Sequence, residues 1–243
     1  MKVFKFGGAS VKDAEGVRNV VKVLENQGFE SCMLVVSAMG KTTNALEKVV
    51  KEYFEEGDYQ QWIQKIKEEH IGIAGELFEK NHPIFEEIKI IFDEAEFFLK
   101  INKSPNYNFV YDQVVTCGEI ISSKILSSYL KESRFSNEWL DARDFIKTDA
   151  NYREGLINWE ITEKNVLKLD NDKFYVTQGF IGSDDNNFTV SLGREGSDYS
   201  AAIFAYCLNA SDVTIWKDVP GVMTGDPQKF ENVELLTNIS YEE

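Results

Sequence analysis

The chain opens with Met1-Lys2-Val3-Phe4-Lys5-Phe6-Gly7-Gly8-Ala9-Ser10, and this stretch decides the fold. Residues 3–6 form a short, mostly apolar run that is typical of a strand, and a glycine pair ends it. Apolar side chains then recur at helical spacing, at Val17, Val20, Val21 and Leu24. This order of strand, glycine turn and helix favours a parallel β-α-β arrangement.

The same pattern recurs along the chain. Residues 32–36 are continuously apolar, as expected of a strand covered on both faces, and Leu46, Val49 and Val50 then resume helical spacing. Further strands are predicted at residues 139–141, 174–177, 188–192 and 213–216, with helices near residues 156–169 and 197–208. The alternation predicts an α/β fold, a three-layer α/β/α sandwich with a mainly parallel open sheet.

Residues of about 53–105 interrupt this alternation. They are rich in Glu, Lys, Phe and Ile and show no strand alternation, so we expect a helical insertion. Residues 108–130 also favour helix, but Thr116-Cys117-Gly118-Glu119 has the spacing of a capping box, which predicts that a helix starts afresh there. With no repeat or linker to mark a boundary, residues 1–243 are interpreted as one domain.

The composition excludes several classes of protein. The 243 residues carry 41 acidic and 26 basic side chains, a net charge of -15. A nucleic-acid partner is not expected, because proteins that bind nucleic acid cluster Lys and Arg. No apolar run is long enough to span a bilayer. We therefore expect a soluble, cytoplasmic protein with neither nucleic acid nor membrane as partner.

The cysteines and histidines offer little material for metal or nucleophilic chemistry. Cys32, Cys117 and Cys207 lack the paired spacing of a zinc site or a disulfide framework and are predicted to be buried free thiols. His70 and His82 lie in a polar helical stretch and are predicted to be surface residues. No metal site in the protein itself is expected.

Four glycine-containing junctions follow predicted strands, at residues 5–10, 37–44, 178–182 and 193–198. In an open α/β sheet, ligands bind at the carboxyl ends of the strands, where such junctions gather. Glycine lets backbone amides approach a phosphate, and a helix amino terminus attracts the same anion. The spacing matches neither a Walker loop nor a dinucleotide fingerprint. A plain turn at Gly7 and Gly8 is the alternative.

The charged residues at two junctions allow two interpretations each. Lys5 lies inside an apolar strand, where a cation is costly to bury without an anionic partner. Either a bound phosphate supplies that partner, or Lys5 points outward from an edge strand. Arg194 and Asp198 flank a glycine at a predicted helix start, where Ser197 or Asp198 can also serve simply as the N-cap.

Taken together, these motifs resemble those of the aspartokinases, in the amino acid kinase superfamily. Residues 5–10 are similar to the family's Lys-Phe-Gly-Gly-Thr-Ser signature, and three further motifs follow in the family's order, at residues 176–182, 192–199 and 216–221. Four ordered motifs are far more specific than any one of them. The resemblance extends over essentially the whole chain.

The resemblance implies a reaction. The γ-phosphoryl group of ATP, bound with Mg²⁺, would pass to the β-carboxylate of L-aspartate and give 4-phospho-L-aspartate, the first step toward lysine, threonine and methionine. Lys5 and Asp198 would be the catalytic residues, with Lys5 neutralising the transferring group and Asp198 orienting Lys5. No general base is required, because the attacking carboxylate is already ionised at neutral pH.

The resemblance also implies binding roles. For aspartate, Arg194 would hold the α-carboxylate and Glu119 the ammonium group, with Thr43 and Ser197 as added contacts. The residues implied for ATP are Lys5, Gly7, Gly8, Ser10, Lys217, Asp218, Met223 and Asp226. Apart from the resemblance, Glu119 is equally explained by the capping box, and Thr43 by a helix amino terminus.

The sequence departs from the family pattern at Ala9, Met223 and Gln228, where Thr, Tyr and Arg are common. It also stops at Glu243, before the family's next nucleotide-contacting motif and before its regulatory ACT modules. A catalytic domain truncated at its C-terminal end is therefore expected, and any homo-oligomer would form mainly through the missing modules.

Two alternatives to an aspartate kinase stay open. The same fold can phosphorylate another small acceptor, such as glutamate, acetylglutamate or a nucleoside monophosphate. The chain can also be a fragment that binds nucleotide or amino acid without turnover.

Overall fold

The computed structural model describes residues 1–219, 221–227 and 229–240. Three features of the sequence analysis therefore lie outside the described residues. These are Pro220 of the last motif, the departure from the family pattern at Gln228, and the end of the chain at Glu243.

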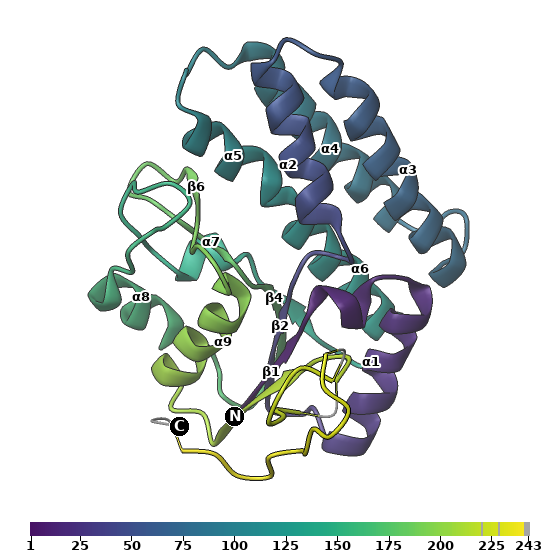
Figure 1. The fold of residues 1–243 in the computed structure, drawn as a ribbon, viewed down its shortest axis with the longest axis vertical. Helices are drawn as coiled ribbons and strands as arrows, with labels where there is room; N and C mark the ends of the chain where they lie inside the picture. The colour runs from purple at the N-terminus through teal and green to yellow at the C-terminus, as the bar shows by residue number, and fades with distance from the viewer. Residues whose placement is uncertain (220, 228, 241–243) are drawn as a thin grey trace.

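A five-stranded parallel sheet forms the centre of the molecule (Figure 1). Its order is β3 (Glu138–Trp139), β4 (Phe174–Gln178), β2 (Cys32–Val36), β1 (Lys2–Phe6) and β7 (Asp212–Trp216). Every neighbouring pair in it runs parallel. The predicted α/β sandwich with a mainly parallel open sheet is confirmed. Strands β5 (Ile181–Ser183) and β6 (Thr189–Ser191) form a separate antiparallel pair.

Helices cover both faces of the sheet, and further helices extend beyond it (Figure 1). Helices α1 (Ala14–Gln27) and α6 (Cys117–Glu132) lie on one face, and α9 (Gly196–Cys207) lies on the other. The remaining helices are η1 (Gly8–Val11), α2 (Thr42–Phe54), α3 (Tyr59–Leu77), α4 (Ile84–Ile101), α5 (Tyr107–Val115), α7 (Ala142–Phe145) and α8 (Trp159–Val166).

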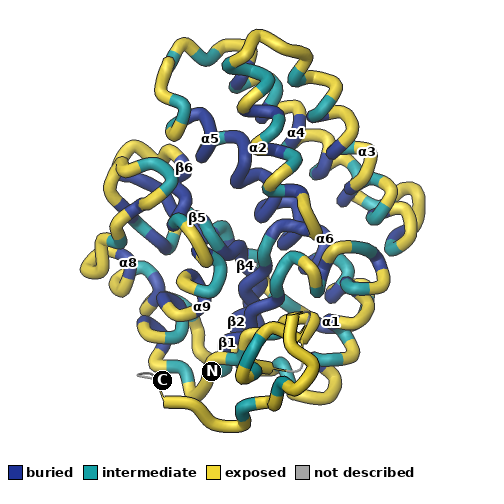
Figure 2. Tube along the Cα trace, in the orientation of Figure 1, coloured by how far each residue is buried: buried dark blue, intermediate teal, exposed yellow. Residues whose placement is uncertain are grey.

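The alternation of side chains along β1 explains how the two faces are built. Phe4 and Phe6 belong to the core that includes residues of α1 and α6. Val3 belongs to the opposite core, which includes Phe204 of α9. Since successive side chains on a strand point to opposite faces, Lys5 shares the α9 face with Val3. Figure 2 shows β1 and β2 at the buried centre of the molecule, where all five residues of β2 are buried.

Local signals define the ends of α1. The Asp13 side chain caps its start by accepting a hydrogen bond from the Gly16 amide at 2.8 Å. Gly28 ends it with φ +80, a backbone conformation that costs glycine little, and donates its amide to Leu24 at 3.0 Å. The first predicted strand-turn-helix unit is therefore confirmed.

The capping box predicted at Thr116 is wrong, although a helix does start afresh there. Thr116 has helical dihedral angles, and its hydroxyl donates to the Asp112 carbonyl one turn back at 2.6 Å. It makes no side-chain cap bond within the described part of α6. The Thr-x-x-Glu spacing is therefore not a capping box: the Thr116 hydroxyl bonds to the preceding helix, and Glu119 lines a cavity described below.

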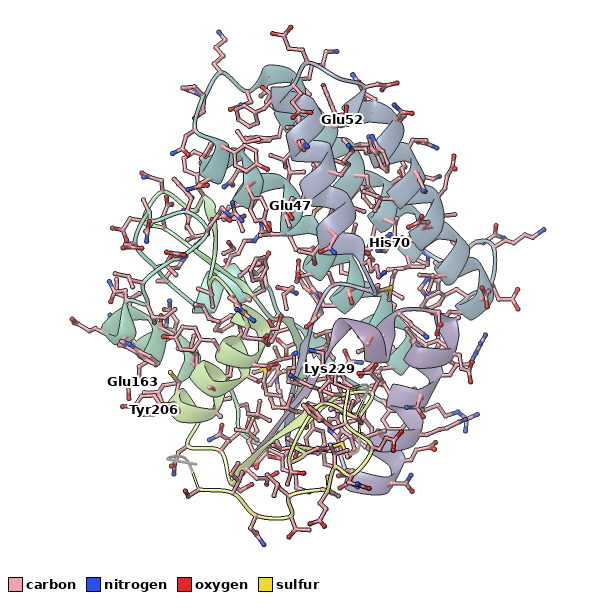
Figure 3. The ribbon with its side chains drawn as sticks, viewed as in Figure 1. Glu47, Glu52, His70, Glu163, Tyr206 and Lys229 are labelled. Atoms are coloured by element: carbon pink, nitrogen blue, oxygen red, sulfur yellow. The ribbon has the colours of Figure 1, made fainter. Side chains whose placement is uncertain are left out.

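The prediction that His70 lies on the surface is wrong (Figure 3). Its exposed fraction is 1%, because α3 packs against α2 and turns this position inward. One ring nitrogen lies 2.7 Å from the Ile66 carbonyl and the other 3.3 Å from the Thr42 hydroxyl. Burial lowers the pKa of His70, so the neutral ring fits this environment. His82 is only partly buried and stacks on Phe78.

The three cysteines are buried free thiols, as predicted. Burial raises the pKa of Cys32 to about 12 and that of Cys207 to about 11. The pKa of Cys117 is raised for the same reason. All three thiols are therefore protonated and unreactive at neutral pH.

Candidate active site

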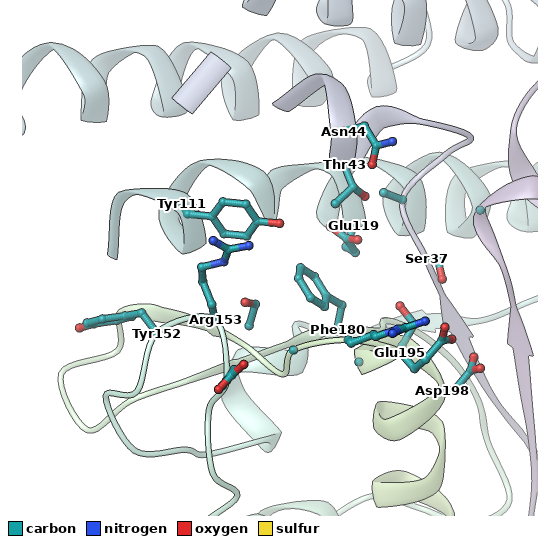
Figure 4. Close-up of a pocket in the computed structure, with 18 of the residues that line it drawn as sticks. Ser37, Thr43, Asn44, Tyr111, Glu119, Tyr152, Arg153, Phe180, Glu195 and Asp198 are labelled. Carbon is teal, nitrogen blue, oxygen red and sulfur yellow. The ribbon is translucent and has the colours of Figure 1, made fainter. Parts of the chain in front are cut away.

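An open cavity of about 920 Å³ lies where the strands of the main sheet end and the helices α2, α5 and α6 begin to rise above it (Figure 4). All four glycine junctions contribute to its lining. The residues predicted for the site that line this cavity are Lys5, Gly8, Thr43, Glu119, Arg194, Ser197 and Asp198.

Lys5 and Asp198 form an ion pair at one side of this cavity. The Lys5 Nζ lies 2.5 Å from Asp198 Oδ1, and Lys217 Nζ lies 3.4 Å from Asp198 Oδ2. Burial opposes the ionisation of Asp198, but the hydrogen bond and charge of Lys5, with help from Lys217, hold its pKa below the ordinary value. The carboxylate is therefore ionised at neutral pH.

The position of β1 decides between the two interpretations of Lys5. The strand lies between β2 and β7, so Lys5 cannot point outward from a sheet edge. Its exposed fraction is 6%, and its ammonium group faces the cavity beside the start of α9. Such a cation, nearly dry and held by one carboxylate, is suited to attract a further anion.

The surroundings of the two glycines after β1 differ, as the position of an added Cβ at each shows. A Cβ on Gly7 would lie 3.7 Å from the Lys5 ammonium nitrogen, in the space next to that charge. A Cβ on Gly8 would lie 2.6 Å from the Ala38 carbonyl oxygen, which real structures do not tolerate. The absence of side chains thus leaves room beside Lys5 and lets the turns after β1 and β2 pack together.

The Glu119 side chain brings a buried, partly unsatisfied carboxylate to the cavity. It lies in the first turn of α6 with an exposed fraction of 3%, and its Oε2 has no hydrogen-bond partner among the described residues. Burial raises its pKa to about 8, although backbone hydrogen bonds from its own residue and from Ala38 oppose the shift. A buried carboxylate with one oxygen unsatisfied is suited to bind a cation.

The start of α9 brings Arg194 and Ser197 to the cavity. Glu195, the residue before this helix, has φ 56 and makes no side-chain cap bond within the described chain. Asp198 lies inside the first turn and pairs with Lys5, so capping does not explain it. Arg194 is exposed in the loop that precedes the helix.

Of the eight residues predicted to contact ATP, Lys5 and Gly8 line this cavity and the other six do not. Gly7 lies next to the Lys5 side chain, and Lys217 pairs with Asp198, so both are adjacent to residues that line the cavity. The Ser10 hydroxyl donates to the Trp216 carbonyl at 3.4 Å. Asp218, Met223 and Asp226 lie in the segment after β7, where Asp226 pairs with Lys229 at 3.4 Å. The roles of these residues stay predictions.

Other residues line the cavity although the sequence analysis gave them no role at the site. Tyr111 comes from α5, Phe180 from the turn after β4, and Tyr152 and Arg153 from the loop before α8 (Figure 4). Tyr111 and Arg153 carry no glycine motif, and only packing brings them to the ends of the strands.

The amino acid kinase family model matches residues 1–243, the whole chain. The chain belongs to the amino acid kinase family. Within the family it is 31% identical to the lysine-sensitive aspartokinase 3 of Escherichia coli, a match that covers 99% of this chain and 54% of that protein. It is also 31% identical to the aspartokinase of Chlamydia trachomatis, over 99% of this chain and 54% of the relative.

Solved structures of the family agree with the fold. E. coli aspartokinase III, solved in complex with aspartate and ADP, superposes with a TM-score of 0.86 at 28% identity, over 97% of this chain and 53% of that one. The aspartate kinase of Clostridium acetobutylicum gives a TM-score of 0.81 at 23% identity, over 100% of this chain and 53% of that one. The resemblance to aspartokinases is confirmed, and the chain spans about half the length of these relatives.

Two kinds of feature are absent from the described residues. Among their helices, none is both long and apolar enough to pass through a bilayer. Within residues 1–219, 221–227 and 229–240, no three His, Cys, Asp or Glu side chains gather as a metal-binding group.

Proposed function

We propose that this chain is the catalytic part of an aspartate kinase, which transfers the γ-phosphoryl group of ATP to the β-carboxylate of L-aspartate. The observation that carries the proposal is one cavity with the Lys5–Asp198 pair at one side and Glu119, whose Oε2 has no partner among the described residues, facing the same space. An amino acid with a second carboxylate complements both features. The likeness to proteins named aspartokinases supports the same acceptor.

The transfer is proposed to proceed in line. An oxygen of the aspartate β-carboxylate attacks the γ-phosphorus, and the bond from that phosphorus to the β,γ-bridging oxygen breaks. ADP leaves with the electron pair, and the product is 4-phospho-L-aspartate. Such transfers depend mainly on positioning and charge neutralisation, which the Lys5 ammonium supplies next to the space left by Gly7.

The nucleotide is expected to bring Mg²⁺, which would neutralise phosphate charge when bound. Mg²⁺ commonly keeps several waters and binds through substrate phosphates and one or two carboxylates. Asp198, which lines the cavity with an ionised carboxylate, fits the part of such a ligand, and the space at Gly7 fits phosphate oxygens. In the acceptor half, Glu119 would bind the ammonium group, and Arg194, Thr43 and Ser197 would contact the rest of the molecule.

A coupled ADP-release assay with a panel of acceptors tests the proposal. L-aspartate should be used in preference to L-glutamate, N-acetylglutamate and a nucleoside monophosphate. Lys5→Ala should lower kcat with aspartate by at least about 100-fold, as the loss of one preorganised charge does. The control is Lys80→Ala, which removes an exposed lysine outside the cavity and should leave kcat unchanged.

The assay also separates the alternatives. Preference for another acceptor would assign the chain to a different kinase of the same family. Binding of ATP and aspartate by calorimetry without ADP release would instead favour a binding fragment. Near-normal turnover by Lys5→Ala would remove Lys5 from the mechanism.

A further inference from the structure

Arg153 has an unusual backbone that a buried carboxylate holds in place. Its φ is +74, in the left-handed region that most residues other than glycine avoid. Its amide donates to Asp112 Oδ2 at 2.8 Å. The same carboxylate accepts from the Ser191 amide at 2.9 Å and, through Oδ1, from the Ser191 hydroxyl at 2.6 Å. Backbone strain of this kind persists only where the surroundings impose it, and it is concentrated at functional sites.

The strained backbone places the Arg153 guanidinium in the cavity. The group lies 4.2 Å from the centre of the Tyr111 ring, and both residues line the same cavity as Lys5 and Glu119. Among the described residues, the guanidinium has neither an ion-pair partner within 4.0 Å nor a hydrogen-bond acceptor. A planar cation held by a ring face keeps its edge free for a carboxylate.

The neighbouring charges suggest which anion this edge receives. Burial and the charge of Glu47 raise the pKa of Tyr111 to about 12, Arg153 opposes the shift, and Glu119 adds to it. The Tyr111 hydroxyl therefore lies within electrostatic reach of both Arg153 and Glu119. In Figure 4, Arg153 and Tyr111 lie at one side of the cavity, Asp198 lies at the other, and Glu119 lies between them.

An α-amino acid fits this order of charges. If the reacting carboxylate lies near Lys5 and the ammonium group near Glu119, the α-carboxylate must lie beside the ammonium group, since one carbon carries both. The side of Glu119 away from Asp198 is where the free guanidinium edge of Arg153 lies (Figure 4).

We propose that Arg153 is a second guanidinium contact for the α-carboxylate of the acceptor, alongside Arg194, and that Asp112 positions it. The inference rests on the proposed function, because it assumes an acceptor with a free α-carboxylate. Arg153 is thereby a specificity-determining residue, since an acceptor that lacks this carboxylate gains nothing from it.

Arg153→Gly is the sharpest test, because glycine adopts a positive φ without strain and the variant should fold at least as well as the original chain. A matched control exists in Arg134→Gly. Arg134 has φ 69 but is exposed and lies outside the cavity. Each protein is assayed by ADP release and by calorimetry with L-aspartate and with its α-amide, isoasparagine, which keeps the β-carboxylate and the ammonium group.

Arg153→Gly should raise the KM and Kd for aspartate by about 10- to 100-fold, the value of a charge-assisted contact. It should leave the KM for ATP unchanged, and it should leave the KM for isoasparagine unchanged because the contact is already absent there. Arg134→Gly should leave the KM for both acceptors unchanged. Asp112→Asn should raise the KM for aspartate in the same selective way, because it loosens the loop that holds Arg153.

The outcomes separate the inference from the function on which it rests. The inference is overturned if Arg153→Gly has the same KM for aspartate as the original chain. It is also overturned if the variant's KM rises equally for aspartate and isoasparagine. Either result leaves the proposed function standing. The same holds if Glu47→Gln restores aspartate binding to the Arg153→Gly variant, because Arg153 would then serve only to balance the charge of Glu47 at Tyr111. If the original chain neither binds nor phosphorylates aspartate, both proposals fall.

Discussion

At the scale of single residues, the candidate site consists of charges placed where folding alone does not favour them. Lys5 lies on an interior strand and keeps one carboxylate, Asp198, as partner. Glu119 has no partner for one of its oxygens, and its raised pKa expresses the cost of burying its charge. Removing the Glu119 charge should therefore stabilise the chain while it damages binding.

Glu119→Gln should separate these two effects. Burial raises the pKa of Glu119 from its ordinary value of 4.5 to about 8 in the folded chain. Because the folded pKa is raised, this group's favourable contribution to stability is complete below about pH 4.5 and is lost as the pH rises through about 8. Urea unfolding should show Glu119→Gln more stable than the original chain by more than about 1 kcal/mol at pH 8, with the difference vanishing near pH 4.

The same variant should bind aspartate more weakly. The KM for aspartate should rise by about 10- to 100-fold, the effect expected when a charge-assisted contact to the ammonium group is removed. In the original chain, the affinity for aspartate should increase from pH 6 to pH 8, because a larger fraction of Glu119 is ionised at the higher pH. Binding near pH 7 should release protons. Calorimetry in buffers of different ionisation enthalpy measures that release, and a pH-independent affinity would contradict the assigned role.

At the scale of elements, the site depends on two turns that pack backbone against backbone. The turn after β1 and the turn after β2 are joined by a hydrogen bond from the Gly40 amide to the Gly8 carbonyl at 2.9 Å. Gly8 has no room for a side chain, because its Cβ would meet the Ala38 and Gly40 carbonyl oxygens at 2.6 and 3.2 Å. The requirement for glycine thus comes from the packing of two elements.

Gly8→Ala should therefore force these turns apart. We expect the free energy of unfolding to fall by about 1 to 3 kcal/mol, as for other overpacked sites, together with a loss of kcat because Lys5 lies on the adjoining strand. Gly72→Ala in α3 is the control, since its Cβ would meet no described atom within 4 Å. Alanine in that exposed helix position should stabilise the chain by about 0.5 to 1 kcal/mol. Similar stability changes in the two variants would show that the packing of the turns is loose.

At the scale of the whole molecule, the cavity is built from both sides of the fold. The sheet and α9 supply Lys5 and Asp198, whereas the helices above the sheet supply Thr43, Tyr111 and Glu119. A ligand that contacts both groups links them, and by mass action it stabilises the folded state over the unfolded one.

MgADP with L-aspartate should therefore raise the melting temperature. At about 100 times its Kd a ligand stabilises by about 2.7 kcal/mol. For a chain of this size each kcal/mol corresponds to about 2 to 4 °C, so a rise of about 5 to 10 °C is expected. Succinate, which lacks the ammonium group that Glu119 would bind, should add little to MgADP alone. An equal rise with succinate and aspartate would argue against recognition of the amino group.

Much of the fold follows from the sequence. The apolar runs, the helical spacing and the glycine junctions were sufficient to predict the strands of the main sheet and the helices beside it. The resemblance to aspartokinases implied that Lys5, Gly8, Thr43, Glu119, Arg194, Ser197 and Asp198 belong to one site, and these residues do line one cavity. Their signals are local in the chain, because glycine turns and capping positions depend on neighbouring residues.

Other features needed the tertiary structure, because they depend on contacts between distant segments. The polar stretch around His70 gives no sign that α3 turns this ring against α2 and buries it. The Thr116 spacing suggested a capping box, but a hydrogen bond to Asp112 uses that hydroxyl instead. Arg153 shows no motif at all, and its place at the cavity depends on contacts with the buried Asp112 carboxylate and the Tyr111 ring. The sequence determined which elements form and which turns carry glycine, whereas packing between elements decided which charges are left without partners and face the cavity.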